Sequence, residues 1–271
     1  MITDQREYLA VVDSNPESVY CYHSLHYTEE NDSFFDHSHK KGQFTYVEGG
    51  TIHVKTNITN YFVPGNHFIW IPAGVNHSVY SNSESVQMRS LYIPILSDEK
   101  QYYNTVGVYP ATDLLLQLLS HTKEWRGDIL KSHRKPYPIV QAIKVLLPDF
   151  SKTPIHFTIP IIKDEKLKQV TEFLNNNLSE NILLSQLAEK FEINERTLHR
   201  LFKKNTNISY IKFFTLLRMY KAIDYLAQKK YSISEIASKV GYSSIPTFSN
   251  TFYKVIGKRP SDYQRGAEIL K

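Results

Sequence analysis

The chain of 271 residues contains a single cysteine and no apolar run long enough to cross a bilayer. Cys21 alone excludes an internal disulfide and a cysteine-based zinc site, and it fits a reducing compartment. A transmembrane helix needs about 20 mostly apolar residues. The opening stretch MITDQREYLAVVD also lacks the basic and then apolar order of a signal peptide. We therefore expect a cytoplasmic protein that does not enter a membrane.

Acidic residues are scarce in only one part of the chain. Residues 163–271 hold 19 Lys and Arg against 11 Asp and Glu, a net charge of +8, whereas residues 1–162 hold 13 against 16, a net charge of −3. A basic segment of this kind indicates a polyanion such as nucleic acid as partner, although runs of charge more often form a solvated face.

The pattern of apolar residues divides the chain at about the same place. Up to Ile95 short β-type runs alternate with Gly and Pro turns, from Ala111 to Phe150 the apolar period becomes helical, and from Lys166 nearly everything is helical. We predict an α+β chain with two domains, a β-barrel over residues 1–96 and an all-α domain over 163–271, with a helical dimerisation or linker region over 97–162 between them. The apolar stripes of 111–150 predict a homodimer, with closure of the barrel as the alternative.

The helical half contains an internal repeat. LSQLAEKFEIN (184–194) aligns with ISEIASKVGYS (233–243) at an offset of 49, and Leu198, Phe202 and Asn207 align with Phe248, Phe252 and Gly257 at an offset of 50. Each copy has the pattern of a helix-turn-helix. The stretch 208–228 between them predicts one helix about 31 Å long, close to the ~34 Å between two recognition helices on one face of DNA.

This segment closely resembles the paired helix-turn-helix domain of the AraC/XylS transcription regulators. The resemblance covers residues 163–265 and lies in LAEKFEINERTLHRLFKK, LLRMYKA and IASKVGYSSIPTFSNTFYKVIGKRPSDYQR. It implies a non-enzymatic regulator, more often an activator, with double-stranded DNA, a small-molecule effector and RNA polymerase as partners.

Carried over by position, the resemblance assigns DNA contacts to both units. In the first unit these are Arg196, His199 and Arg200 toward bases, with Lys203 and Lys204 toward phosphates. Arg can bond bidentately to guanine, and Lys neutralises phosphates without reading sequence. In the second unit the candidates are Ser243, Ser244, Ile245, Ser249, Asn250 and Lys254.

The second recognition helix departs from the family because Ile245 and Pro246 stand where polar or basic groups are usual. Pro246 is compatible with the first helical turn, Ser243 or Ser244 can cap it, Ile245 can touch a thymine methyl and Asn250 can pair with adenine. The alternative is that this unit mainly grips the DNA backbone. Either way, base specificity should come mostly from the first unit.

HSHKKGQFTYVEGG and GNHFIWIPAGVNH resemble the two cupin motifs of the sensor domain fused to this regulator family. His37, His39 and His77 match the metal-binding histidines of cupins, but Gln43 stands where a Glu ligand is usual. A neutral amide is a poorer ligand than a carboxylate, so the sequence leaves open a divalent metal, an organic effector, or hydrogen bonds among these groups.

Three kinds of protein remain possible at this stage. The favoured one is a DNA-binding transcription regulator controlled by a small molecule or metal. A cupin metalloenzyme with a DNA-binding tail would need an open metal position, and an architectural DNA-binding protein would show little sequence preference.

Overall fold

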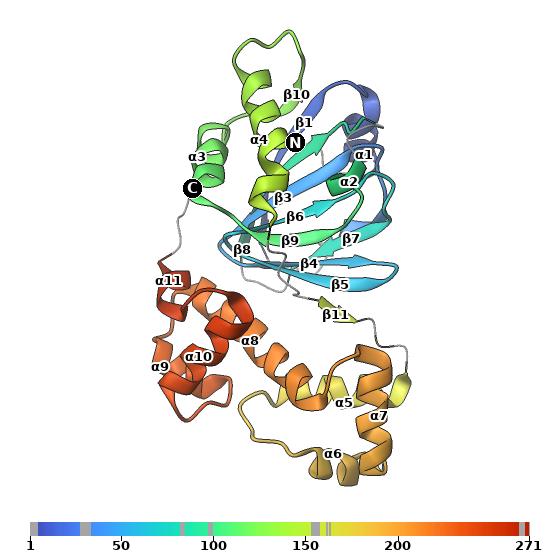
Figure 1. Ribbon diagram of the computed structural model, residues 1–271, viewed down its shortest axis with the longest axis vertical. Coiled ribbons are helices and arrows are strands. Elements are labelled where there is room, and N and C mark those ends of the chain that lie inside the picture. The colour runs from blue at the N-terminus through green and yellow to red at the C-terminus, as the bar shows by residue number, and fades with distance from the viewer. Residues whose placement is uncertain are drawn as a thin grey trace. The chain divides into compact units, whose positions relative to one another are not determined.

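A computed structural model describes residues 5–27, 34–81, 85–96, 100–152, 158–160, 162, 164–265 and 269–270. The chain forms two compact units, one of residues 1–57, 61–157 and 267–271 and the other of residues 58–60 and 158–266. The first is rich in β-strands and the second is helical (Figure 1), which confirms the predicted α+β class with two domains. Within the described residues, none of the helices is both long enough and apolar enough to cross a membrane.

The strands form two antiparallel sheets. The six-stranded sheet has the order β10 (Gly127–Ile129), β1 (Val19–Tyr27), β8 (Ser85–Ile93), β3 (Gly42–Glu48), β6 (His67–Ile71) and β9 (Gly107–Pro110). The five-stranded sheet has the order β11 (Thr158–Pro160), β5 (Thr59–Pro64), β4 (Thr51–Thr56), β7 (His77–Tyr80) and β2 (Phe34–His37). The predicted barrel is therefore a sandwich of two sheets.

Strand β3 separates two environments because successive side chains point to opposite faces of a sheet. Phe44 and Tyr46 face a hydrophobic core, whereas Gln43 and Thr45 line a pocket. Helices α3 (Asp113–His121) and α4 (Pro136–Phe150) complete the core on the outer face of the six-stranded sheet (Figure 1). The short helices α1 (Gln5–Ser14) and α2 (Lys100–Tyr103) belong to the same unit.

The apolar stripes of residues 111–150 are used mainly inside this unit. The buried positions of α3 and α4 pack in the core of the six-stranded sheet: Leu115, Leu119, Val140, Ile143 and Leu147. Leu114 and Val145 stay exposed, at 54% and 69%. Most apolar residues of 111–150 therefore cover the β domain, which was the alternative to dimerisation. The homodimer stays a prediction, and it depends on the exposed Leu114 and Val145.

The chain returns to the β-rich unit after the last helix. The buried Glu48 carboxylate at the end of β3 accepts hydrogen bonds from the backbone N–H groups of Ile269 and Leu270, at 2.8 and 3.1 Å. Leu270 is itself part of the core on the outer face of the six-stranded sheet. The outer face of β3 therefore holds a segment that follows the helical unit in sequence.

The helical unit contains α5 (Glu165–Asn176), α6 (Leu184–Lys190), α7 (Glu195–Thr206), α8 (Tyr210–Gln228), α9 (Ile233–Lys239), α10 (Ile245–Ile256) and α11 (Pro260–Gln264). Helices α6 and α7 form the first predicted helix-turn-helix, and α9 and α10 form the second. Helix α8 has 19 residues, so it is about 28 Å long at about 1.5 Å per residue.

The repeat extends to backbone conformation. The turns use a left-handed residue at the same place, Glu192 with φ 51° and Gly241 with φ 79°. The recognition helices end alike, at left-handed Asn207 and Gly257. The extra residue of the second copy lies at the helix start, because Ser244 caps α10 by accepting from the Thr247 N–H. Ser244, rather than Ser243, is thus the cap.

Arg218 of α8 ties the helix-turn-helix units together. Its guanidinium donates to the carbonyls of Leu178 and Glu180, at 2.9 and 2.6 Å, and lies 4.3 Å from the centroid of the Phe214 ring. It also approaches the turn of the second unit, where a Cβ atom on Gly241 would lie 2.5 Å from Arg218 Nη2. A Cβ atom there would also lie 2.7 Å from the backbone oxygen of Leu178, so this close approach favours glycine at 241, whereas Glu192 shows that the positive φ alone does not require it.

Candidate DNA-binding surface and effector pocket

The first recognition helix presents its predicted DNA contacts together. Arg196, His199, Arg200 and Lys203 follow the spacing of one helical face, and all of them are exposed. The opposite face of α7 is fixed in the core by Leu198 and Phe202, which are fully buried. The sequence thus folds α7 as a half-buried helix whose free face carries the cations.

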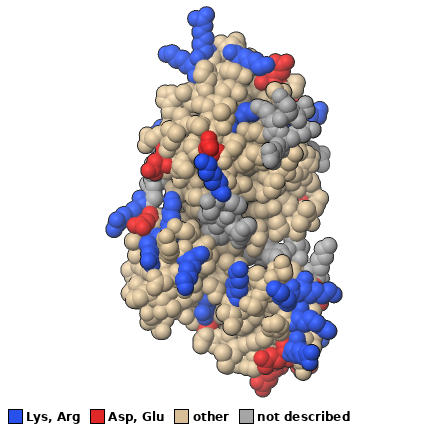
Figure 2. All heavy atoms as spheres, in the orientation of Figure 1, with Lys and Arg blue, Asp and Glu red and all other residues tan. Residues whose placement is uncertain are grey.

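The cations of α7 differ in what holds them. Lys203 Nζ donates to the carbonyl of Asn207 at 3.1 Å, so it also closes the end of its own helix. Figure 2 shows Lys and Arg side chains gathered on the side where Figure 1 places α7, with an acidic group beside them. No carboxylate in the described ranges forms an ion pair with Arg196 or Arg200.

The second recognition helix presents fewer polar groups of its own. Ile245 is 44% exposed, Asn250 and Lys254 are exposed, and Ser249 is half-buried. Phe248 and Phe252 are fully buried on the opposite face, so Pro246 neither breaks α10 nor disturbs its packing. Ser243 is exposed in the turn, and Ser244 is committed to the cap.

Two residues that the sequence analysis did not single out join this face. Tyr253 is 50% exposed and falls one turn after Ser249 and Asn250. The Arg259 guanidinium donates to Asn250 Oδ1 at 2.7 Å and lies 4.9 Å from the Tyr253 ring centroid. The internal repeat could have indicated Arg259. It pairs Arg259 with Ser209, which caps α8, and arginine cannot make that capping bond because a guanidinium has no acceptor.

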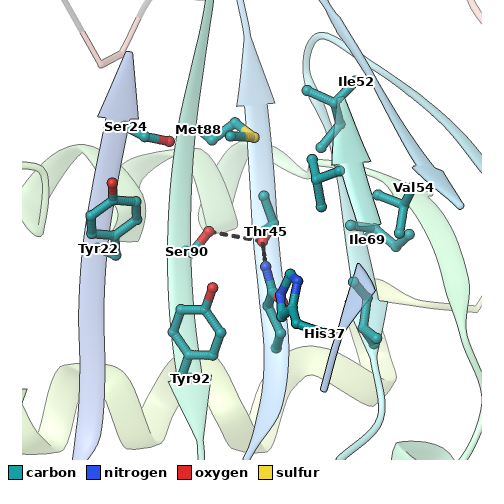
Figure 3. Close-up of a pocket in the computed structure, with 13 residues that line it drawn as sticks. Tyr22, Ser24, His37, Thr45, Ile52, Val54, Ile69, Met88, Ser90 and Tyr92 are labelled. Carbon is teal, nitrogen blue, oxygen red and sulfur yellow. Dashed lines mark hydrogen bonds between the residues drawn. The ribbon is translucent and has the colours of Figure 1, made fainter. Parts of the chain in front are cut away.

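The β-rich unit contains a pocket between its two sheets, with an empty volume of about 400 Å³ that includes its open mouth. One wall is polar and the other aliphatic (Figure 3). The polar wall comes from β1, β3 and β8: Tyr22, Ser24, Gln43, Thr45, Ser90 and Tyr92. The remaining lining residues are His37, Ile52, Val54, Ile69, Ile71, Val79 and Met88.

The polar wall includes a buried hydroxyl that is available to a ligand. Thr45 Oγ1 is hydrogen-bonded to Ser90 Oγ and to Gln43 Nε2, both at 2.9 Å. Ser24 Oγ, in contrast, is buried without a hydrogen-bond partner among the residues that the structure describes. A buried hydroxyl without a partner costs free energy, about 1–3 kcal/mol, so Ser24 is a natural contact for a bound molecule.

His37, His39 and His77 lie together beside this pocket, as the cupin-like motifs predicted. One nitrogen of each ring lies within 4.8 Å of the others. His39 and His77 are buried, and burial lowers the pKa of both, that of His77 to about 3 with the nearby His37 as a further cause. Both rings are therefore neutral at pH 7 and have a lone pair to offer.

Hydrogen bonds determine which nitrogen carries the lone pair. The Nδ1 atoms of His39 and His77 face the carbonyls of Lys41 and Val75, which only accept, so Nδ1 donates. The two Nε2 atoms then lie unprotonated at 2.9 and 3.1 Å from Gln43 Oε1. The two Nε2 atoms and Gln43 Oε1 are therefore three hydrogen-bond acceptors that face one another with no proton between them. A bound cation would satisfy all three. Alternatively, the Gln43 amide is turned so that its NH₂ group donates to the imidazoles.

A metal ion fits this donor set. Imidazole Nε2 atoms whose Nδ1–H groups are held by carbonyls are oriented as metal ligands usually are. His37, His39, His77 and the Gln43 oxygen would supply the ligands, all of them neutral. The ion would bring a positive charge and a Lewis acid to the edge of the pocket.

Both units match known families. Residues 21–101 match the AraC-like ligand binding domain, and residues 187–266 match a helix-turn-helix domain. Among curated proteins, the chain is 27% identical to the HTH-type transcriptional regulator NimR of Escherichia coli K12 over 231 residues, which cover 84% of this chain and 81% of NimR.

Two further matches each cover about two fifths of the chain. The chain is 30% identical to the HTH-type transcriptional activator RhaS of Salmonella arizonae over 107 residues, which cover 40% of this chain and 38% of RhaS. The C-terminal domain of AraT, a response regulator from Geobacillus stearothermophilus, is 30% identical with a TM-score of 0.37, covering 38% of this chain and 85% of that structure.

Over its two units the chain is thus similar to the AraC-type transcriptional regulators, which are a non-enzymatic family. It joins an AraC-like ligand-binding domain to a helix-turn-helix DNA-binding domain, so it is a DNA-binding transcriptional regulator. The reading as a cupin metalloenzyme is thereby set aside.

Proposed function

We propose that the chain is a cytoplasmic transcription activator that responds to an uncharged organic molecule held between the two sheets. The observation that carries the proposal is the pocket with one polar and one aliphatic wall inside the ligand-binding domain. A mostly apolar concave site with a few convergent polar groups is the usual form of a small-molecule site.

The residues that line the pocket indicate that the effector is uncharged. The described lining residues include no Asp, Glu, Lys or Arg. A carboxylate or phosphate buried there would lose its hydration without gaining an opposite charge, which is costly. A neutral molecule with a polar edge toward Ser24 and an apolar body toward Ile52 and Val54 fits both walls.

Matched chemical pairs test this choice. We expect thermal melting of the purified full chain to shift upward with some neutral esters or amides and not with the corresponding carboxylic acids. Ser24→Ala should reduce the shift, whereas Ser78→Ala on β7, outside the lining, should leave it unchanged. Equal shifts with the acids would contradict an uncharged effector.

Activation is the regulatory direction that we propose. RhaS, which is 30% identical to this chain over 107 residues, is named as a transcriptional activator. A reporter promoter with a bound site upstream should be expressed more strongly with the chain than without it, through contact with RNA polymerase. Lower expression from that arrangement would indicate repression instead.

The three-histidine cluster supports a divalent metal as a second candidate effector. Metal analysis of purified protein, before and after dialysis against a chelator, should then find one ion per chain. His77→Ala should abolish binding, and Gln43→Glu should tighten it because a carboxylate replaces the amide. Protein free of metal, with a melting temperature unchanged by added Zn²⁺, would remove this candidate.

A further inference from the structure

We infer that Arg259 supplies the base-reading guanidinium of the second recognition surface and that Asn250 positions it. The surface is defined as the exposed face of α10 with Ile245, Ser249, Asn250 and Tyr253, together with Arg259 at the start of α11. This inference rests on the proposed DNA contacts of α7 and α10.

The internal repeat shows that the two units place their arginine differently. At an offset of 50, Arg200 corresponds to Asn250 and Lys203 corresponds to Tyr253. The same offset pairs Ser209 with Arg259. The first unit thus carries a guanidinium on its recognition helix, and the second carries an amide there and an arginine nine residues later.

The two members of the pair Ser209 and Arg259 do different work. Ser209 caps α8 by accepting from the Lys212 N–H. Arg259 occupies the equivalent cap position of α11 and makes no side-chain cap bond, because a guanidinium has no acceptor. Its side chain lies instead on the face of α10.

The geometry fixes the guanidinium but leaves it available. One N–H bonds to Asn250 Oδ1 at 2.7 Å, and the plane lies over the Tyr253 ring, with 4.9 Å between the guanidinium carbon and the ring centroid. Arg259 is exposed and has no ion pair among the described residues. Four of its five N–H donors therefore remain for a partner.

The chemistry of the partner follows from these donors. A planar, ordered guanidinium matches the O6 and N7 acceptors of guanine in the major groove. Asn250 already accepts from Arg259, so it acts as a positioning residue rather than as a separate reader of adenine. The second half-site should therefore require a guanine, and the two half-sites are more equal in information than the charges of α7 and α10 alone suggest.

The test is a binding-site selection from random DNA with the full chain and three variants. Arg259→Ala should lower affinity for the selected site about tenfold to a hundredfold and remove a guanine preference from one half-site only. Arg259→Lys should keep the salt dependence of binding but lose the guanine preference. Arg265→Ala, at the other end of α11, removes an equal charge and should leave the preference intact.

Positioning is tested through a double-mutant cycle. Asn250→Ala should weaken the same guanine preference in part, and in the Arg259→Ala background it should add little. Melting curves establish that each variant is folded.

Two outcomes would overturn the inference. One is an unchanged site profile for Arg259→Ala, and the other is an equal loss of affinity for all sequences, as removal of a phosphate contact would give. Arg200→Ala separates this from a failure of the proposed DNA contacts, because it should change the other half-site whatever Arg259 does.

Discussion

At the scale of single residues, Arg218 shows how a family motif is used in this fold. The motif LLRMYKA marks this arginine as part of the linker helix, and an exposed cation would be the simple expectation from its charge. In the structure it bonds two backbone carbonyls and lies against aromatic rings, and burial lowers its pKa. Its role is to hold the helical unit together.

Replacing Arg218 should therefore act on stability first. Arg218→Ala leaves the carbonyls of Leu178 and Glu180 without their donor, and we expect a loss of about 2–4 kcal/mol in the free energy of unfolding of the helical unit. Lys212→Ala, an exposed cation on the same helix, should cost little. Chemical denaturation measures both, and equal effects would mean that Arg218 acts only through its charge.

A second prediction at this scale concerns the cations of the recognition helices. Arg200→Ala should cost about 1–3 kcal/mol on the preferred site and relax base choice in one half-site. Lys254→Ala should weaken preferred and random DNA alike, because a phosphate contact carries no base information. Fluorescence anisotropy with both DNAs distinguishes the two variants. A uniform loss for Arg200→Ala would assign it to the backbone.

The sequence predicted residues whose role is local and missed those whose role depends on distant contacts. Pro246 fits the first turn of α10 as its position indicated, and Ser244 caps this helix as one of two alternatives. Arg259 was missed because its contact with Asn250 spans nine residues and depends on how α11 follows α10. Ser24 was missed because only the paired strands bring it into the pocket.

At the scale of elements, α8 sets the separation of the two recognition helices. It is a continuous helix of 19 residues, fixed by buried side chains along its length. We therefore expect one preferred spacing of about 10 base pairs between half-sites, one turn of the duplex.

Inserting base pairs between the half-sites tests this rigidity. Five extra base pairs place the second half-site on the opposite face of the duplex, so binding should fall to that of a single half-site. Electrophoretic mobility shifts on a series of spacings give the result. Equal affinity across the series would show that α8 does not fix the separation.

Helices α3 and α4 show why element type is easier to predict than packing. Their apolar stripes predicted helices, and both are present. A stripe shows that one face is buried but not against which surface. Most apolar residues of α3 and α4 pack against the six-stranded sheet, because β3, β6 and β8 present large apolar side chains on that face.

At the scale of the whole molecule, the exposed apolar residues of α3 and α4 bear on assembly. Leu114 and Val145 remain exposed on α3 and α4, and we predict a homodimer through residues 111–150. Sedimentation of the full chain at tens of micromolar should give twice the monomer mass, and Val145→Asp should return it to the monomer. A monomer with and without DNA would remove the prediction.

The cupin-like motifs were predictive of the site but not of its ligand. The three histidines meet as their spacing indicated, because β2 and β7 are paired with His37 opposite His77. Whether a cation or the Gln43 amide satisfies them depends on proton positions that a sequence does not contain.

The central claim is that this chain recognises a specific DNA sequence and that its cations contact the DNA phosphates. The most direct measurement compares its affinity for a site selected from random DNA with its affinity for unselected DNA, from about 50 to 200 mM salt. The account predicts a ratio of at least about a thousandfold, and affinity that falls steeply with salt as phosphate contacts release counterions. A ratio near one, or an affinity that does not change with salt, would contradict it.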